Sequence, residues 1–105
     1  MSDAPTAAEA RFAVPADHPS LPGHFPGRPV VPGVVLLDLA AQAARRAFGL
    51  GPMQRVLRAK FTAPVLPTQE VALRLRRPAP GRVAFACDAF SAEAEFATDP
   101  GDSPA

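Results

Sequence analysis

The sequence predicts an α+β domain in which an antiparallel sheet packs against one helix. One apolar stretch, from Gly33 to about Phe48, has the length and spacing of a helix. The shorter segments after it alternate apolar with polar residues, as half-buried strands do. The length of 105 residues favours a single domain, and 48% hydrophobic residues exclude a chain disordered throughout. We expect the domain at residues 10–98, with residues 1–9 and 99–105 as flexible ends.

The first predicted element is a short strand at residues 10–14. Residues 15–29 contain too many prolines for a helix or a central strand. A long irregular loop in a compact domain is usually either functional or disordered. Phe25 and the closely spaced prolines and glycines favour an ordered, functional loop.

The predicted helix begins after Pro32, which suits a first turn because its missing N–H is not needed there. Gly49 is a suitable stop. Apolar residues cover most of the circumference, which predicts a helix buried nearly all round. The polar residues form one narrow stripe along it: Asp38, Gln42, Arg45 and Arg46.

Four strands are expected after the helix, each joined to the next as a hairpin. They are predicted at residues 54–61, 70–76, 82–90 and 92–98, with turns at residues 62–68 and 78–81. Alternation places three residues of the second strand on one face, and four of the third. These sets are Val71, Leu73 and Leu75, and Val83, Phe85, Cys87 and Ala89.

Charge is unevenly distributed along the chain. Residues 41–82 contain nine Arg or Lys and one acid, whereas residues 83–105 contain five acids and no Arg or Lys. The basic middle can attract an acidic partner, and the alternative is a solvated arginine-rich surface. Nucleic acid is not an expected partner, because no arginine cluster is interleaved with aromatic residues that could stack on bases.

Neither a disulfide nor a membrane segment is expected. Cys87 is a single cysteine in an apolar alternating run, which favours a buried small hydrophobe. The N-terminus lacks the basic and apolar regions of a signal peptide, and the longest apolar run is interrupted by Pro32, Gly33, Asp38 and Gln42. The expected location is therefore the cytoplasm.

Three features near the start of the helix suggest chemistry on a carbonyl compound. The helix N-terminus at Gly33 and Val34 offers free N–H groups and partial positive charge, which would polarise the carbonyl of a thioester. His24 precedes it in the rigid loop and is suited to act as a general base near neutral pH. Asp38 lies about 7–8 Å further along the helix axis. In an apolar pocket the pKa of its carboxyl would rise, so that it could act as an acid. Together they fit removal of a proton next to a thioester with loss of a β-hydroxyl.

Each residue also has a structural interpretation. His24 could be a structural or exposed loop residue. Asp38 could form a helix-surface ion pair with Arg45 or Arg46. Gly33 could be no more than a helix-start residue.

The same stretch resembles a known family. The residues that carry the resemblance are Gly23-His24-Phe25-Pro26-Gly27-x-Pro29-x-x-Pro32-Gly33-Val34, followed by Leu37-Asp38 and Gln42. They are similar to the 3-hydroxyacyl-acyl-carrier-protein dehydratases of the FabA/FabZ hot-dog superfamily. A second segment extends the resemblance more weakly. Its residues are Ala59-Lys60-Phe61-x-x-Pro64-Val65-x-Pro67. The short chain and its Leu36-Leu37-Asp38 resemble compact members of aryl-polyene or other specialised lipid pathways.

The resemblance implies a hot-dog fold, with a curled antiparallel sheet around one central helix. It implies a homodimer in which His24 of one subunit, the base, faces Asp38 of the other, the acid. The Gly33 N–H would bind the substrate carbonyl, Val34, Phe25 and Pro32 would contact the substrate, and Gln42 would support Asp38. No metal and no resident cofactor are implied, because the acyl group rides on the phosphopantetheine of acyl carrier protein. Basic residues near the tunnel mouth would meet that acidic carrier, from among Arg28, Arg45, Arg46, Arg55, Arg58 and Lys60.

Three functional hypotheses follow. The first is dehydration of a 3-hydroxyacyl thioester on acyl carrier protein to the trans-2-enoyl thioester. The second is a non-catalytic hot-dog subunit that binds the acyl group or the carrier. The third is a hot-dog acyl thioesterase with Asp38 activating water, which leaves the loop around His24 unexplained.

Overall fold

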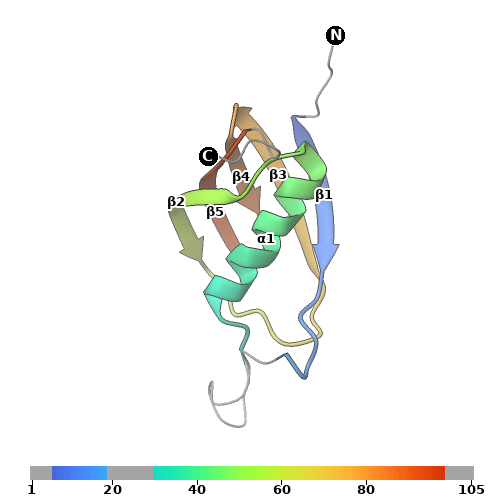
Figure 1. The fold of residues 1–105 in the computed structure, drawn as a ribbon. Coiled ribbons are helices and arrows are strands. Elements are labelled where there is room, and N and C mark those ends of the chain that lie inside the picture. The colour runs from blue at the N-terminus through green and yellow to red at the C-terminus, as the bar shows by residue number, and fades with distance from the viewer. Residues whose placement is uncertain (1–5, 19–29, 99–105) are drawn as a thin grey trace.

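A computed structural model describes residues 6–18 and 30–98 of the chain. It contains one helix and five strands in those ranges (Figure 1). In chain order they are β1 (Ala7–Phe12), α1 (Gly33–Phe48), β2 (Met53–Phe61), β3 (Val71–Ala79), β4 (Arg82–Ala86) and β5 (Phe90–Phe96). The helix lies across one face of the sheet (Figure 1), which confirms the predicted α+β class.

The five strands form one antiparallel sheet in the order β1-β3-β4-β5-β2. The predicted hairpin links are right for β3, β4 and β5, but the link from β2 to β3 is not a hairpin. Residues 62–70 carry the chain past the end of the sheet, so that β2 pairs with β5 at the opposite side from β1 (Figure 1). Alternation reports which face a strand buries, but it carries no information about the neighbour of that strand.

The helix has the predicted bounds because its two ends are fixed by local chemistry. Pro32 is the N-cap with φ −61° and ψ 144°, and Gly49 adopts a left-handed conformation with φ 66°. The N–H groups of Gly49 and Leu50 both donate to the carbonyl of Arg45, at 2.9 and 3.2 Å, and so satisfy the last turn.

Only one face of α1 is buried within this chain, so the prediction of a helix buried nearly all round is wrong for the single chain. The buried residues are Leu36, Ala40, Ala41, Ala44 and Phe48, which face the sheet. Val34 is 73% exposed on the other side. Apolar residues lie outside the buried stripe, which indicates a surface that another molecule covers.

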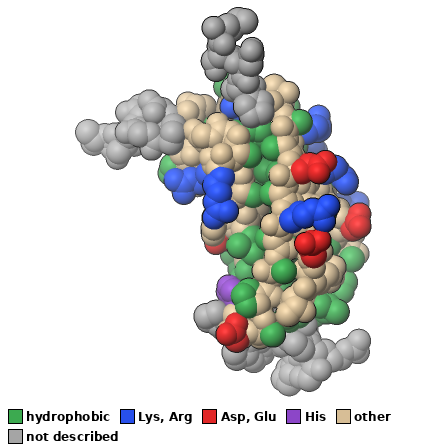
Figure 2. Space-filling model, turned by 90° about the vertical axis from the view of Figure 1, so that its right-hand side faces the viewer, with side chains coloured by type: hydrophobic (Ala, Val, Ile, Leu, Met, Phe, Trp, Pro, Cys, Tyr) green, Lys and Arg blue, Asp and Glu red, His purple; other side chains and the backbone are tan. Residues whose placement is uncertain are grey.

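The inner face of the sheet supplies the rest of the core. Val71, Leu73 and Leu75 of β3 are buried, as predicted, and so are Val83 and Phe85 of β4. A groove of about 300 Å³ lies between α1 and β1, and its apolar lining includes Phe12 and Leu39. Hydrophobic side chains are visible down the middle of that side of the molecule in Figure 2.

None of the five predicted strands has the bounds that the structure shows, and two of the differences have a plain physical reason. The single strand predicted at residues 82–90 is wrong: β4 ends at Ala86, and the Cys87 N–H donates to the carbonyl of Phe90 in a turn. Cys87 is therefore half-buried in the turn, while Ala89 is buried. The alternation concealed this turn because the buried positions continue in phase beyond it. β1 begins at Ala7 rather than at residue 10, since Ala8 and Ala10 face the core but are too small to give a strong apolar signal.

Candidate functional site

The N-terminus of α1 presents backbone donors, as the sequence predicted. The first helical bonds run from the N–H groups of Val35 and Leu36 to the carbonyl of Pro32, at 3.0 and 3.3 Å. Pro32 gives no side-chain cap, and the first turn contains no acidic residue. Within the described ranges the N–H groups of Gly33 and Val34 have no acceptor. These donors, together with the helix dipole, favour a partly negative oxygen at this position.

A cavity of about 450 Å³ adjoins these donors and is mainly apolar. Its lining includes Pro32, Gly33 and Leu36 from the helix start, Phe61 from the end of β2, and residues 62–65. The site therefore combines an apolar cavity with the polar N–H group of Gly33 in its lining, which is the usual composition of a small-molecule site.

Phe61 determines how close another group can come to Gly33. A Cβ atom built on Gly33 would lie 2.9 Å from Cζ of Phe61, so glycine fits beside this ring without a clash. The ring is tilted against Phe90, with centroids 5.6 Å apart, and the residue is 45% exposed. The sequence prediction did not include Phe61 among the site residues. Its neighbour Gly33 is distant in sequence, and only the packing of β2 beside the helix start brings them together.

Asp38 lies one and a half turns after Gly33, and its carboxylate points outward from the chain. Its Oδ2 accepts a hydrogen bond of 2.9 Å from Nε2 of Gln42, so these two predicted residues are in contact. Asp38 is exposed in the single chain and not in the apolar pocket that the sequence predicted. The alternative pairing with Arg45 or Arg46 is also wrong, since no ion pair joins them in the part of the chain that the structure describes.

His24 and Phe25 lie outside the described residues, so their predicted places in the site stay predictions. Residues 6–18 and 30–98 contain no group of three His, Cys, Asp or Glu side chains that could hold a metal ion. The same residues include no helix long and apolar enough to cross a membrane.

The family of the chain follows from comparison with known proteins. The model of the ApeI-like family, described as ApeI dehydratase, matches residues 1–99. The chain belongs to the ApeI-like dehydratase family.

Two solved structures similar to this ApeI-like chain share its hot-dog fold. One is the dehydratase heterocomplex ApeI:P from Xenorhabdus doucetiae, with a TM-score of 0.76, 20% identity and 92% of each chain covered. The other is an uncharacterised protein from Erwinia carotovora subsp. atroseptica, with a TM-score of 0.74 and 25% identity over 91% of this chain and 86% of that one. The predicted hot-dog fold class is confirmed.

Curated relatives of the ApeI-like chain carry the name 3-hydroxyacyl-[acyl-carrier-protein] dehydratase FabZ. The protein from Thermus thermophilus is 42% identical over 60 residues, which cover 49% of this chain and 42% of that protein. The protein from Bartonella quintana is 33% identical over 82 residues, which cover 68% of this chain and 53% of that protein. The matched region thus spans about half the length of these relatives.

One further feature of the ApeI-like chain is an apolar surface that includes Phe61 of the cavity. Among the residues that the structure describes, the exposed large hydrophobic ones are Val34, Val56, Leu57, Phe61 and Leu66. They lie at the helix start, along β2 and in the segment after β2, and the outer edge of β2 pairs with no other described strand. An apolar surface beside an open strand edge is typical of a protein–protein interface.

Proposed function

We propose that this ApeI-like chain dehydrates a 3-hydroxyacyl thioester, carried on acyl carrier protein, to the trans-2-enoyl thioester. The observation that carries the proposal is the arrangement on α1. The open N–H of Gly33 is followed, five residues along the helix, by an exposed Asp38 carboxyl that Gln42 holds. The dehydratase names of the family and of its FabZ relatives support the same reaction.

In the proposed reaction the base and the acid act on neighbouring carbons of the substrate. His24 removes a proton from C2, and the negative charge that develops on the thioester oxygen is stabilised by the N–H of Gly33. The double bond forms between C2 and C3 as the C3–O bond breaks. Asp38 donates a proton to the departing hydroxyl, which leaves as water. The proton on His24 then returns to Asp38 through solvent, and both groups are ready for the next turnover.

The proposed site needs a second chain. Asp38 points away from its own core and Val34 is exposed beside it, so a partner packed on this surface would enclose the carboxyl and close the cavity. We propose a homodimer in which His24 of one subunit faces Asp38 of the other. The similar structure from Xenorhabdus is named as a heterocomplex. A heterodimer of two different chains is therefore the alternative to the homodimer.

Docking of an acidic carrier is part of the same proposal. Arg55 and Arg58 are ion-paired with Glu95 and Glu93, at 2.8 and 3.0 Å, and are therefore less available to a carrier. Arg45, Arg46 and Lys60 have no ion pair in the described part of the chain, which makes them the stronger candidates for the carrier contact. Arg28 lies outside the described residues.

The reaction is tested by mass spectrometry on carrier proteins loaded with short, medium and aryl-conjugated 3-hydroxyacyl groups. We expect loss of one water from a preferred substrate, and no loss with His24→Ala or Asp38→Asn. Gel filtration and circular dichroism of each variant establish that it is folded and assembled as the wild-type protein is.

Other outcomes would assign one of the competing functions. Free carrier thiol in place of the enoyl product would identify a thioesterase. A folded protein that binds loaded carrier but releases no water, alone or with a co-expressed second hot-dog chain, would identify a non-catalytic subunit. Activity that appears only with the second chain would replace the homodimer by a heterodimer.

A further inference from the structure

The face of the sheet that points away from α1 contains a second, larger hollow of about 780 Å³. We call it the outer-face trough. Its floor is made by small residues on the two middle strands: Ala84 and Ala86 of β4 and Ser91 of β5. Its two walls carry basic residues, and Glu9 of β1 also lines the hollow, opposite Arg74 in the strand register. Arg74 and Arg76 rise from β3 on one side, and Arg58 and Lys60 rise from β2 on the other.

The strand register places these residues in two rows across the sheet. In one row Arg74 lies opposite Ala86, Ala86 opposite Ser91, and Ser91 opposite Lys60. In the next row Arg76, Ala84, Glu93 and Arg58 follow in the same way. The walls are therefore three strand spacings apart, or about 14 Å. An α-helix with its side chains is about 10–12 Å wide, so it fits between them.

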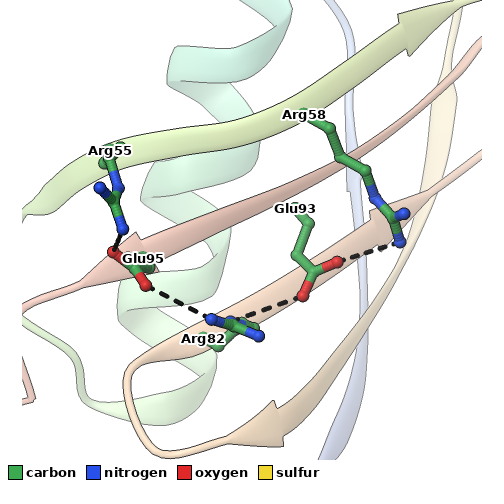
Figure 3. Close-up of polar contacts among 5 residues, drawn as sticks. All are labelled: Arg55, Arg58, Arg82, Glu93 and Glu95. Atoms are coloured by element: carbon green, nitrogen blue, oxygen red, sulfur yellow. Dashed lines mark hydrogen bonds and ion pairs between the residues drawn. The ribbon is translucent and has the colours of Figure 1, made fainter.

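The charges of this face do not cancel. On this face the strands carry seven cations and three acids: Arg11, Arg55, Arg58, Lys60, Arg74, Arg76 and Arg82, against Glu9, Glu93 and Glu95. Arg11 is ion-paired with Glu70, just before β3. Glu93 and Glu95 are already engaged in an ion-pair ladder with Arg55, Arg58 and Arg82, on the side of the strands away from α1 (Figure 3). Arg74, Arg76 and Lys60 are left without an ion pair among the residues that the structure describes. A second copy of this face would repel it, whereas an acidic partner would match it.

We propose that the outer-face trough docks an acidic α-helix of a partner protein. The acids along both sides of that helix would meet Arg74 and Arg76 on one wall and Lys60 on the other, and its small residues would rest on the floor. The proposal does not depend on the proposed reaction, because the trough lies on the opposite side of the sheet from Gly33 and Asp38. Lys60 is also a candidate for the carrier contact, whereas Arg74 and Arg76, which the test changes, are not.

The composition of the trough argues against two other occupants. Single-stranded nucleic acid needs aromatic platforms, and Phe85, Phe90 and Phe96 of the neighbouring strands are buried on the opposite face. A membrane surface would need exposed large apolar side chains around the cations. None of the residues that line the outer-face trough is an exposed large apolar residue.

The test measures fluorescence anisotropy of a labelled, stapled peptide helix with glutamates along both edges and alanines between them. The double variant Arg74→Glu/Arg76→Glu should weaken its binding to the full-length protein by at least about tenfold. The matched variant Arg74→Lys/Arg76→Lys keeps both charges and should stay within about threefold of wild type. Raising the salt concentration should weaken binding to the wild type more than to the charge-reversed protein.

A variant in the floor of the trough distinguishes a helix bound within the trough from non-specific electrostatic binding of any polyanion. Ser91→Leu leaves the charge unchanged and alters an exposed position, so the protein should fold, but the larger side chain should lower helix binding by about tenfold. Three results would each overturn the proposal: no measurable binding of the peptide at low salt, unchanged binding to Ser91→Leu, or equal binding of a scrambled acidic peptide. Tighter binding of a single-stranded DNA oligonucleotide would show that the trough is a nucleic-acid site instead.

Discussion

At the scale of single residues, Gly33 and Phe61 form the contact that matters most for the proposed site. Both line the cavity, and the space between them is too small for a methyl group unless the ring moves. The neighbouring atom is the outer end of a half-exposed ring, so the ring can swing aside at small energetic cost. Stability and activity are therefore expected to respond differently to a change at this position.

Gly33→Ala should leave the free energy of unfolding within about 1 kcal/mol of wild type, because the helix propensity of alanine offsets the displacement of the ring. Turnover should fall by at least about tenfold, because the methyl group and the displaced ring crowd the N–H donor. Urea unfolding and the water-loss assay give the two quantities. The double variant Gly33→Ala/Phe61→Ala should recover part of the turnover; no recovery would show that the crowding does not involve the ring.

Gln42 supplies a second residue-level test, because its side chain donates a hydrogen bond to Asp38 one turn away. Gln42→Ala should lower kcat by about tenfold with little change in KM, because the acid loses its orientation in the transition state. The free energy of unfolding should change by no more than about 0.5 kcal/mol, as for other exposed pairs four residues apart on a helix. Gln42→Asn, whose side chain is too short to reach, is the control and should resemble Gln42→Ala. A variant with wild-type kcat would remove Gln42 from the site.

The sequence was most informative about residues that act within one short segment. Gly33, Asp38 and Gln42 share a single helix, so regular helix geometry placed them correctly relative to one another. Two things needed the fold. The exposure of Asp38 depends on which helix face the sheet covers, and the part played by Phe61 depends on a contact between distant segments.

At the scale of elements, proline and glycine positions predicted the ends of elements better than apolar alternation did. Pro32 and Gly49 fixed the helix bounds because each acts through its own backbone conformation. The turn after β4 has no such marker, and the alternation ran through it. The order of the strands could not be predicted from the sequence pattern, because the pairing of β2 with β5 depends on the path of residues 62–70.

Two glycines with the same conformation provide a matched comparison at this scale. Gly49 and Gly81 have φ of 66° and 74°, but a Cβ at Gly49 meets open space, whereas one at Gly81 would lie 2.9 Å from the carbonyl oxygen of Phe96. Gly49→Ala should lower the free energy of unfolding by about 1–2 kcal/mol, the cost of left-handed backbone alone.

Gly81→Ala should lower the same free energy by at least about 1 kcal/mol more than Gly49→Ala, because a backbone atom must also move. The collision falls where the Phe96 N–H donates to the Gly81 carbonyl at 2.6 Å, so the turn between β3 and β4 would lose a bond to β5. Chemical denaturation of both variants decides the question, and equal losses would contradict the steric part of the argument.

At the scale of the whole molecule, the outward face of α1 and the open edge of β2 indicate an assembled protein. Val34→Asp tests this without harming the monomer, because an acid in the first turn interacts favourably with the helix dipole. Sedimentation or light scattering should show that the wild type is larger than one chain and that Val34→Asp is shifted to the monomer. Its thermal midpoint should be no longer dependent on protein concentration. Wild-type protein that is monomeric at micromolar concentration would contradict the two-chain site.

The order of strands also has a consequence for how the chain reaches its fold. β3, β4 and β5 follow one another in sequence and pair as neighbours, so they can form from local contacts. Each edge strand pairs only with a partner distant in sequence, β1 with β3 and β2 with β5, and such pairings close large loops. We therefore expect the three central strands to form early in folding and the two edges to close late. Newly made chains would then expose the unpaired edges of the central strands before β1 and β2 pair with them. Because exposed edges can pair with other chains, the concentration of nascent chains would affect correct assembly.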